Sequence, residues 1–222
     1  MHEGSWLHLL ANSALAVEMT GPDFTYEQAL IAQGVLAIAG TDEVGRGPLA
    51  GPVVAAAVIL DPNNIPEGLN DSKKLSAKKR DVLFELIQSC ARFSIAEATV
   101  EEVDTLNIYH ASHLAMCRAV EGLGDVGHVL VDGNKIPRDM RPPATAIVKG
   151  DGKSQSIAAA SIVAKVTRDR HMDALAQQYP GYGWDKNAGY PTKGHISALI
   201  ELGVTPHHRR SFKPVHNILC HL

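Results

Sequence analysis

The stretch that decides the fold is residues 35–60, which reads VLAIAGTDEVGRGPLAGPVVAAAVIL. Two apolar runs, 35–39 and 53–60, flank a glycine-rich segment, and short apolar runs bounded by turn residues are typical of buried strands. Gly51 and Pro52 mark a bend between the two runs. We therefore expect two neighbouring strands of one sheet, joined by a tight loop.

The rest of the chain alternates between short apolar runs and longer segments with apolar residues at helical spacing. Further strands are predicted at 92–100, 129–131 and 144–148. Helices are predicted at 76–90, 101–123, 156–179 and 192–202, with a shorter one near 23–30 capped by Thr25 or Asp23. The apolar face of the helix at 76–90 is expected to hold Val82, Leu83, Leu86 and Ile87. This order predicts an α/β fold, with a mixed five-stranded sheet flanked by helices and a helical C-terminal region.

Length and composition set the class of protein. The chain has 222 residues, of which 45% are hydrophobic and 20% charged, as is typical of a globular protein with one domain and a small appendage. We expect an N-terminal extension over residues 1–34 and the main domain over residues 35–222. A net charge of −3 excludes a strongly basic, histone-like binder. It does not exclude a nucleic-acid enzyme, because the local distribution of charge matters more than the sum.

Cysteine usage and hydropathy favour a cytoplasmic location. Cys90, Cys117 and Cys220 are far apart and odd in number, and no metal-binding spacing of Cys and His occurs, so neither a disulfide framework nor a structural zinc site is expected. No run of about 18 apolar residues is present, which predicts that no segment spans a membrane. The apolar N-terminus opens with Glu3 in place of a basic cluster, unlike a signal peptide.

Acidic residues lie in or after three of the predicted strands, namely Asp42, Glu43, Asp132 and Asp151. Acids at strand ends can converge on one edge of a sheet, where carboxylates repel one another unless cations lie among them. Oxygen ligands without Cys or His favour Mg²⁺ or Mn²⁺, and two such ions can promote phosphoryl displacement. Asp132 and Asp151 adjoin glycines, so each alone is more typical of a turn than of a metal site. The adjacent pair in an apolar stretch is the stronger signal, because unpartnered burial costs several kcal/mol.

Several other residues have the chemistry of nucleic-acid contacts. Glycines let a backbone approach a ligand, and arginine offers phosphate a forked donor, so Gly45-Arg46-Gly47 is a candidate binding loop as well as an ordinary tight turn. Tyr190 is a candidate for stacking on a sugar or base, or else a packing anchor. Basic residues that form plausible phosphate tracks, or solvated surfaces, are Lys73, Lys74, Lys78, Lys79, Arg80, Lys149, Lys153, Lys165, Arg168, Arg209, Arg210 and Lys213, with His207 and His208 beside the last group.

A series of motifs then runs along the chain in a fixed order. They are residues 40–54, 71–76, 131–134, 148–151, 157–169, 189–195 and 205–212. Together they resemble the ribonuclease HII family, the type 2 ribonuclease H of bacteria, over about residues 35–215. The resemblance implies a ribonuclease H-like catalytic domain that hydrolyses the RNA strand of RNA–DNA hybrids. It also implies incision 5′ to single ribonucleotides in duplex DNA, as in ribonucleotide excision repair, leaving 3′-hydroxyl and 5′-phosphate ends.

The same resemblance assigns roles to individual residues. The catalytic and metal-binding positions fall on Asp42, Glu43, Asp132 and Asp151, with Mn²⁺ or Mg²⁺ as cofactor. The substrate-binding positions fall on Gly45, Arg46 and Gly47, which read the ribose 2′-hydroxyl, on Tyr190 beneath the junction sugar, and on Lys73, Lys74 and Arg210 as phosphate contacts. The implied partners are RNA–DNA hybrid and ribonucleotide-containing duplex DNA. Residues 215–222 do not match a sliding-clamp motif, and nothing in the sequence indicates an obligate dimer, so a monomer is expected.

Two alternatives stay open at this point. A nucleic-acid-binding module without catalysis would explain the basic residues, but four ordered acids would weaken its hold on phosphate. A different metal-dependent nuclease of the same fold, such as a ribonuclease HI-like enzyme restricted to long hybrids or a resolvase, would explain the acids. Comparing cleavage of a single ribonucleotide with cleavage of a long hybrid separates these possibilities.

Overall fold

The computed structural model describes residues 21–220, and a five-stranded sheet lies at its centre. The strand order is β3-β2-β1-β4-β5. The strands are β1 (Ile38–Val44), β2 (Val53–Ile59), β3 (Arg92–Ala98), β4 (His128–Asp132) and β5 (Ala144–Ile147). β1 runs antiparallel to β2 and parallel to β4, while β2–β3 is antiparallel and β4–β5 is parallel. The mixed sheet predicted from the sequence is therefore confirmed.

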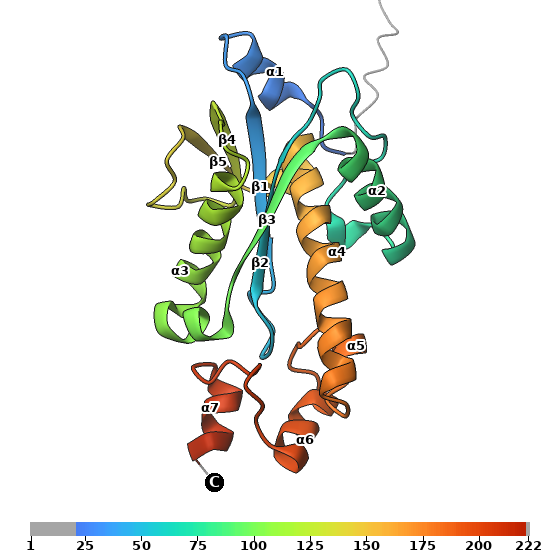
Figure 1. Ribbon diagram of the computed structural model, residues 1–222, viewed down its shortest axis with the longest axis vertical. Coiled ribbons are helices and arrows are strands. Elements are labelled where there is room, and N and C mark those ends of the chain that lie inside the picture. The colour runs from blue at the N-terminus through green and yellow to red at the C-terminus, as the bar shows by residue number, and fades with distance from the viewer. Residues whose placement is uncertain (1–20, 221–222) are drawn as a thin grey trace, which may run out of the picture.

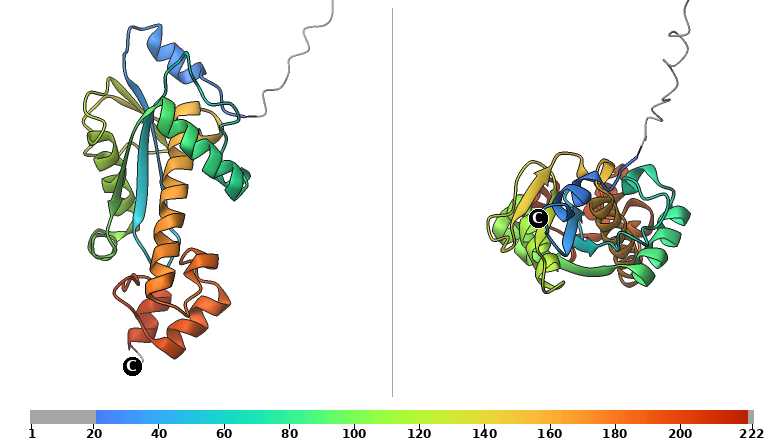
Figure 2. Two further views of the ribbon diagram at one scale, coloured as in Figure 1. Left: turned by 45° about the vertical axis from the view of Figure 1, so that its right-hand side comes forward. Right: turned by 90° about the horizontal axis from the view of Figure 1, so that it is seen from above.

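Helices cover both faces of this sheet. They are α1 (Thr25–Ile31), α2 (Ala77–Cys90), α3 (Val100–Glu121), α4 (Gln155–Gln178), α5 (Trp184–Asn187), α6 (Lys193–Leu202) and α7 (Lys213–Cys220), with 3₁₀ turns η1 (Ser72–Lys74) and η2 (Gly150–Gly152). Figure 1 shows α3 on one face and α4 with α2 on the other. The short helices α5, α6 and α7 gather at one end of α4, and α1 lies at the opposite end of the molecule (Figure 2).

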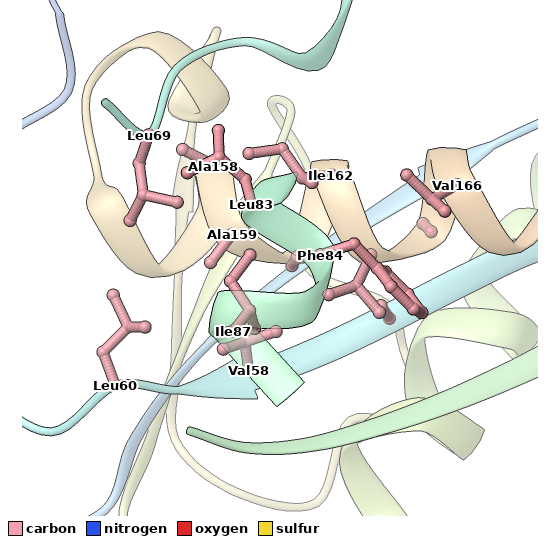
Figure 3. Close-up of a cluster of buried hydrophobic side chains, with 14 of the residues drawn as sticks. Val58, Leu60, Leu69, Leu83, Phe84, Ile87, Ala158, Ala159, Ile162 and Val166 are labelled. Atoms are coloured by element: carbon pink, nitrogen blue, oxygen red, sulfur yellow. The ribbon is translucent and has the colours of Figure 1, made fainter. Parts of the chain in front are cut away.

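The alternating side chains of β2 belong to two apolar clusters, one on each face of the sheet. Ala56 and Val58 face α2 and α4, and this cluster is drawn in Figure 3. Val53, Ala55 and Ala57 face α3. Because both faces of the sheet are covered, β2 is apolar along its whole length instead of alternating with polar residues.

The buried face of α2 differs from the expected one. Leu83 and Ile87 are buried as predicted, but Val82 and Leu86 are 54% and 45% exposed. Phe84 takes their place in the cluster against α4. The apolar stripe therefore runs through positions 83, 84 and 87, because residues three and four apart share one side of a helix.

Only part of the expected N-terminal extension, residues 21–34, belongs to the described residues. Residues 1–20 lie outside them. Residues 21–34 include α1, whose N-cap is Phe24, while the Asp23 side chain accepts a hydrogen bond from the Thr25 N–H at 2.9 Å. Asp23 also bridges Ser154 in β-fashion. The proposed boundary at residue 34 stays a prediction, although α1 is hydrogen-bonded to the main domain. No helix in residues 21–220 is long and apolar enough to cross a membrane.

Candidate active site

Strand register brings the first and third of the predicted acids together. β1 and β4 are adjacent and parallel, and Thr41 pairs with Val131. Asp42 and Asp132 are the next residues along these two strands, so they lie at the same edge of the sheet. Glu43 follows on β1, and its backbone N–H donates to the Asp42 carboxylate at 2.7 Å.

Asp151 reaches the same edge through a short turn after β5. Lys149 adopts a left-handed conformation, with φ of 55°, and the chain then enters η2, which carries Asp151. The Gly150 N–H donates to Asp132 Oδ1 at 2.6 Å. This hydrogen bond ties the turn to the end of β4, so all four predicted acids belong to one region.

The electrostatics of the four acids show how closely they are grouped. Burial raises the pKa of Asp42 well above its usual value, and repulsion from Glu43, Asp132 and Asp151 raises it further. Burial also raises the pKa of Glu43, against the opposing effect of Arg46. The pKa of Asp151 is raised by burial and then by Asp132. Each of these carboxylates is thus unfavourable in its ionised form unless a cation is present.

This donor set fits a hard divalent cation. The four predicted residues offer only carboxylate oxygens, which are the ligands that Mg²⁺ and Mn²⁺ prefer. Within residues 21–220, no three His, Cys, Asp or Glu side chains lie close enough together to surround one ion. A bound cation would therefore have to draw the carboxylates toward itself, and it would offset the repulsion that raises their pKa values.

Sequence reasoning missed a fifth acid, Asp71. It caps η1 by accepting a hydrogen bond from the Lys73 N–H, and, after burial and Asp132, its nearby carboxylate is a further cause of the raised pKa of Asp151. Lys73 lies close to the same acids. Burial lowers its pKa, but Asp42, Asp71 and Asp151 outweigh that effect and shift it upward. An acid just before Ser-Lys-Lys was the available signal, since Asp is a common cap.

The predicted lysine contacts are placed differently from Arg210. An open cavity beside the acids is lined by Asp71, Lys73, Lys74, Asp132, Lys149, Asp151, Gly152 and Lys153. Lys73 and Lys74 therefore share one cavity with Asp132 and Asp151. Arg210 lies elsewhere, in the segment before α7, and its backbone N–H donates to Asp104 of α3 at 2.9 Å.

The Gly45-Arg46-Gly47 loop follows β1 and packs against the buried side chain of Arg168. Gly45 has φ of +98°, and a Cβ there would overlap the side chain of Arg168. Arg46 is half exposed and pairs with Glu43 at 3.2 Å. The loop therefore connects directly to the acid cluster, and its first glycine is required both by its backbone conformation and by the close approach of Arg168.

Arg168 and Arg209 are structural, so their expected place in a phosphate track was wrong. Both are fully buried. Arg168 donates to the carbonyl oxygens of Pro52, Ala50 and Ala188 at 3.0 Å each. Arg209 donates five hydrogen bonds to four carbonyls, those of Gly45, Arg46, Pro48 and Gly51. A loop rich in Gly and Pro forms few backbone pairs, so its carbonyls need such donors.

His208 is also unsuited to a phosphate contact. Burial and the neighbouring His195 and His207 lower its pKa to about 3, so it is neutral near pH 7. It belongs to a buried network in which His195 Nε2 lies 3.0 Å from Trp184 Nε1 and 3.1 Å from His208 Nε2. His195 Nδ1 is in turn 2.9 Å from the Tyr190 carbonyl oxygen. The network therefore fixes the backbone of the loop that carries Tyr190.

Tyr190 lies directly against the candidate binding loop. Tyr190 is 44% exposed, and a Cβ added to Gly47 would lie 3.1 Å from the Tyr190 ring. The Leu49 N–H donates to the Gly189 carbonyl at 2.7 Å, which joins the two loops. An exposed aromatic ring and a glycine-rich loop thus form one surface, continuous with Glu43 through Arg46.

Comparison with known proteins identifies the family and the fold of this chain. The family model for Ribonuclease HII matches residues 39–215. Ribonuclease HII of Ruegeria pomeroyi is 66% identical over 202 residues, covering 90% of this chain and 86% of that protein. Ribonuclease HII of Paracoccus denitrificans is 61% identical over 203 residues, covering 91% and 97%. The crystal structure of ribonuclease H2 from Pyrococcus horikoshii aligns with a TM-score of 0.70 at 27% identity, covering 82% and 97%, which confirms the predicted ribonuclease H-like fold. The chain therefore belongs to the ribonuclease HII family and is a ribonuclease H-type nuclease.

Proposed function

We propose that this chain, in addition to degrading the RNA of RNA–DNA hybrids as ribonuclease HII enzymes do, incises duplex DNA 5′ to single embedded ribonucleotides. The products are 3′-hydroxyl and 5′-phosphate ends, which suit repair of a misincorporated ribonucleotide. The observation that carries the proposal is the proximity of the exposed Tyr190 ring to Gly47, where an added Cβ would lie 3.1 Å from the ring, in a loop that Arg46 joins to Glu43. Residues 35–222 form the proposed catalytic domain.

The acid cluster supplies the proposed catalytic centre. Asp42, Glu43, Asp132 and Asp151 would hold Mg²⁺ or Mn²⁺. When bound, such ions activate water and stabilise charge on the phosphate that is cleaved. Asp42 and Asp132 extend from adjacent paired strands, so the backbone positions of these two proposed ligands are fixed before substrate binds. Burial and repulsion among the acids raise the pKa values of Asp42, Glu43 and Asp151, so a bound cation would favour their ionised forms.

The loop and the ring supply the proposed selectivity for ribose. With the carbonyls of Gly45 and Arg46 engaged by Arg209, the peptide planes of the loop are fixed beside the site. Fixed backbone groups can hydrogen-bond a 2′-hydroxyl, which is the group that distinguishes RNA from DNA. The Tyr190 ring offers a flat surface for the adjoining sugar. Lys73 and Lys74 would contact the phosphates that lead away from the cleaved bond.

A mutational comparison tests the catalytic centre. End-labelled duplex DNA with one ribonucleotide is incubated with the chain in Mg²⁺ or Mn²⁺ and the products are separated by length. Asp42→Asn and Asp132→Asn are expected to abolish incision, because each removes a charged metal ligand. Asp125→Asn is the matched control, since Asp125 is exposed and lies away from the cluster in the turn before β4.

The outcomes separate the alternatives. Incision that persists in EDTA would refute the metal-dependent mechanism. Cleavage of a long RNA–DNA hybrid together with an intact single-ribonucleotide duplex would identify a hybrid-restricted nuclease instead. Tight binding to both substrates with no cleavage in either metal would identify a binding module.

A further inference from the structure

Glu27 is a buried acid that the site described above does not use. It lies on α1, before the region matched by the family model, and its side chain is fully buried. Its Oε1 accepts a hydrogen bond from Ser154 Oγ at 2.6 Å and from the Ser156 N–H at 3.0 Å. Its Oε2 is buried without a hydrogen-bond partner among the described residues. Burying an acid with one unpaired oxygen is costly, so packing alone does not account for it.

The partners of Glu27 are the first residues of α4. A helix begins with backbone N–H groups that have no partner within the helix. Here the Gln155 N–H donates to the Asp23 carbonyl at 3.0 Å, and the Ser156 N–H donates to Glu27. Ser154 Oγ accepts from the Ile157 N–H at 3.2 Å while donating to Glu27. The α1 segment thus supplies the partners for two of these N–H groups, and a carboxylate there is favoured by the helix dipole.

The start of α4 is also the end of the turn that carries Asp151. The Ser154 N–H donates to the Gly150 carbonyl at 2.8 Å. The Gly150 N–H donates to Asp132 Oδ1 at 2.6 Å. The Asp23 N–H donates to the Lys153 carbonyl at 3.1 Å, on the far side of the same turn. A continuous series of hydrogen bonds therefore runs from Glu27 through Ser154 and Gly150 to Asp132, and it passes through the turn that carries Asp151.

We propose that Glu27 is a positioning residue, which fixes the turn bearing Asp151 and thereby sets the affinity of the four-acid centre for a divalent cation. This role rests on the proposed metal site. α1 and the first turn of α4 lie side by side at the end of the molecule opposite α5–α7 (Figures 1 and 2). Residues 23–31 then contribute to the metal site, although they precede the region that the family model matches.

Direct measurement of Mn²⁺ binding to the free protein tests this role without depending on activity. Isothermal titration calorimetry on the full chain compares wild type with Glu27→Ala, Glu27→Gln and Glu67→Gln. Groups that orient metal ligands contribute roughly 10–100-fold to metal affinity, so Glu27→Ala is expected to weaken Mn²⁺ binding about 10-fold. Glu27→Gln keeps the Oε1 acceptor and should recover most of that loss. Glu67 is an exposed acid in the loop after β2, and its variant should bind as wild type does.

Kinetics provide a second readout. Glu27→Ala should raise the Mn²⁺ concentration needed for half-maximal incision while leaving KM for the duplex unchanged at saturating metal. A purely structural role would lower the unfolding midpoint without moving Mn²⁺ affinity in the folded protein, and that result overturns the proposal. If Glu27→Ala does not fold, Ser154→Ala carries the same prediction, because it removes the hydroxyl bonded to Glu27. Unchanged Mn²⁺ affinity in folded Ser154→Ala overturns the proposal equally.

The failure of this role can be told apart from the failure of the metal site. Equal Mn²⁺ affinity in wild type and Glu27→Ala refutes the role of Glu27 alone. A wild-type chain that binds no Mn²⁺ refutes the metal site, and this role with it.

Discussion

Removing the buried guanidinium of Arg209 should release the Gly45–Gly47 loop. Arg209 donates to the carbonyls of Gly45, Pro48 and Gly51 at 2.6 to 3.0 Å and to that of Arg46 at 3.2 Å. It also lies over the Phe212 ring, at 5.1 Å from its centroid. Arg209→Ala removes all of these contacts and leaves four carbonyls without their donor.

The expected loss of stability in Arg209→Ala follows from the number and burial of these hydrogen bonds. A hydrogen bond to a charged group contributes about 1.5–3 kcal/mol, but the cost of burying the guanidinium offsets part of that sum. Breaking a buried charged network typically costs about 3–5 kcal/mol, which we expect for Arg209→Ala. For a chain of this size that corresponds to a fall in Tm of roughly 6–20 °C. Displacement of the loop by about 1 Å would lower incision about 100-fold.

Urea unfolding and single-ribonucleotide incision measure the two effects. Arg210→Ala is the control for stability, because it removes an exposed arginine next in sequence, and it should change the free energy of unfolding by less than about 0.5 kcal/mol. A loss below about 1 kcal/mol in Arg209→Ala, or incision at the wild-type rate, would refute the conclusion that Arg209 holds the loop.

Three further predictions concern the acids, the loop and the ring. In EDTA, Asp42→Asn should be more stable than wild type at pH 7, because it removes one of the mutually repelling carboxylates. The difference should shrink as pH falls, because the pKa values of Asp42, Glu43 and Asp151 are raised and protonation relieves the repulsion in wild type as well. Equal stability of the two proteins at pH 7 would contradict this prediction. Gly45→Ala should lower the free energy of unfolding by on the order of 1–3 kcal/mol, since φ is +98° and Arg168 adjoins it, whereas Gly194→Ala, with open space around its Cβ, should not destabilise. Tyr190→Ala should slow incision more than Tyr190→Phe does, if the ring face is what contacts the sugar, and equal rates in kinetic assays would argue against that contact.

The pH dependence of stability in this comparison follows from the sign of each group's pKa shift on folding. A carboxyl whose pKa is raised in the folded state contributes stability below its unfolded pKa, and this is lost as pH rises through the folded pKa. His208 acts in the opposite direction, because its lowered pKa costs stability as pH falls. It is present in both wild type and Asp42→Asn, so the difference between the two variants isolates the acids.

Strand periodicity predicted the part of the site that rests on the sheet. The apolar runs at 35–39 and 53–60 and the acids that follow strands are local signals, and parallel pairing of β1 with β4 then brings Asp42 beside Asp132. The register of those strands follows from packing on both faces, which a single local pattern does not reveal. The placement of Asp42 and Asp132 at strand ends was therefore predictable, but their juxtaposition required the structure.

The residues that support the site were harder to predict. Arg209 stands in a basic run beside Arg210, and the sequence alone does not distinguish an arginine buried under carbonyls from one that meets phosphate. The available signal was the loop at 45–52, where glycine and proline leave carbonyls that need donors. Glu27 is a single acid in a short helix, and its partners lie 127 and 129 residues further along the chain, beyond the reach of any local pattern.

The position and metal dependence of the cut test the central claim most directly. Three duplexes of identical sequence, containing no ribonucleotide, one ribonucleotide or a run of ribonucleotides, are incubated with the wild-type chain in Mg²⁺, Mn²⁺ or EDTA, and the products are mapped at nucleotide resolution. The four-acid centre beside Arg46 and Tyr190 predicts a metal-dependent cut on the 5′ side of the single ribonucleotide, an uncut all-DNA duplex and no product in EDTA. Equal cutting of the all-DNA duplex, or a single-ribonucleotide duplex left intact in both metals, would contradict it.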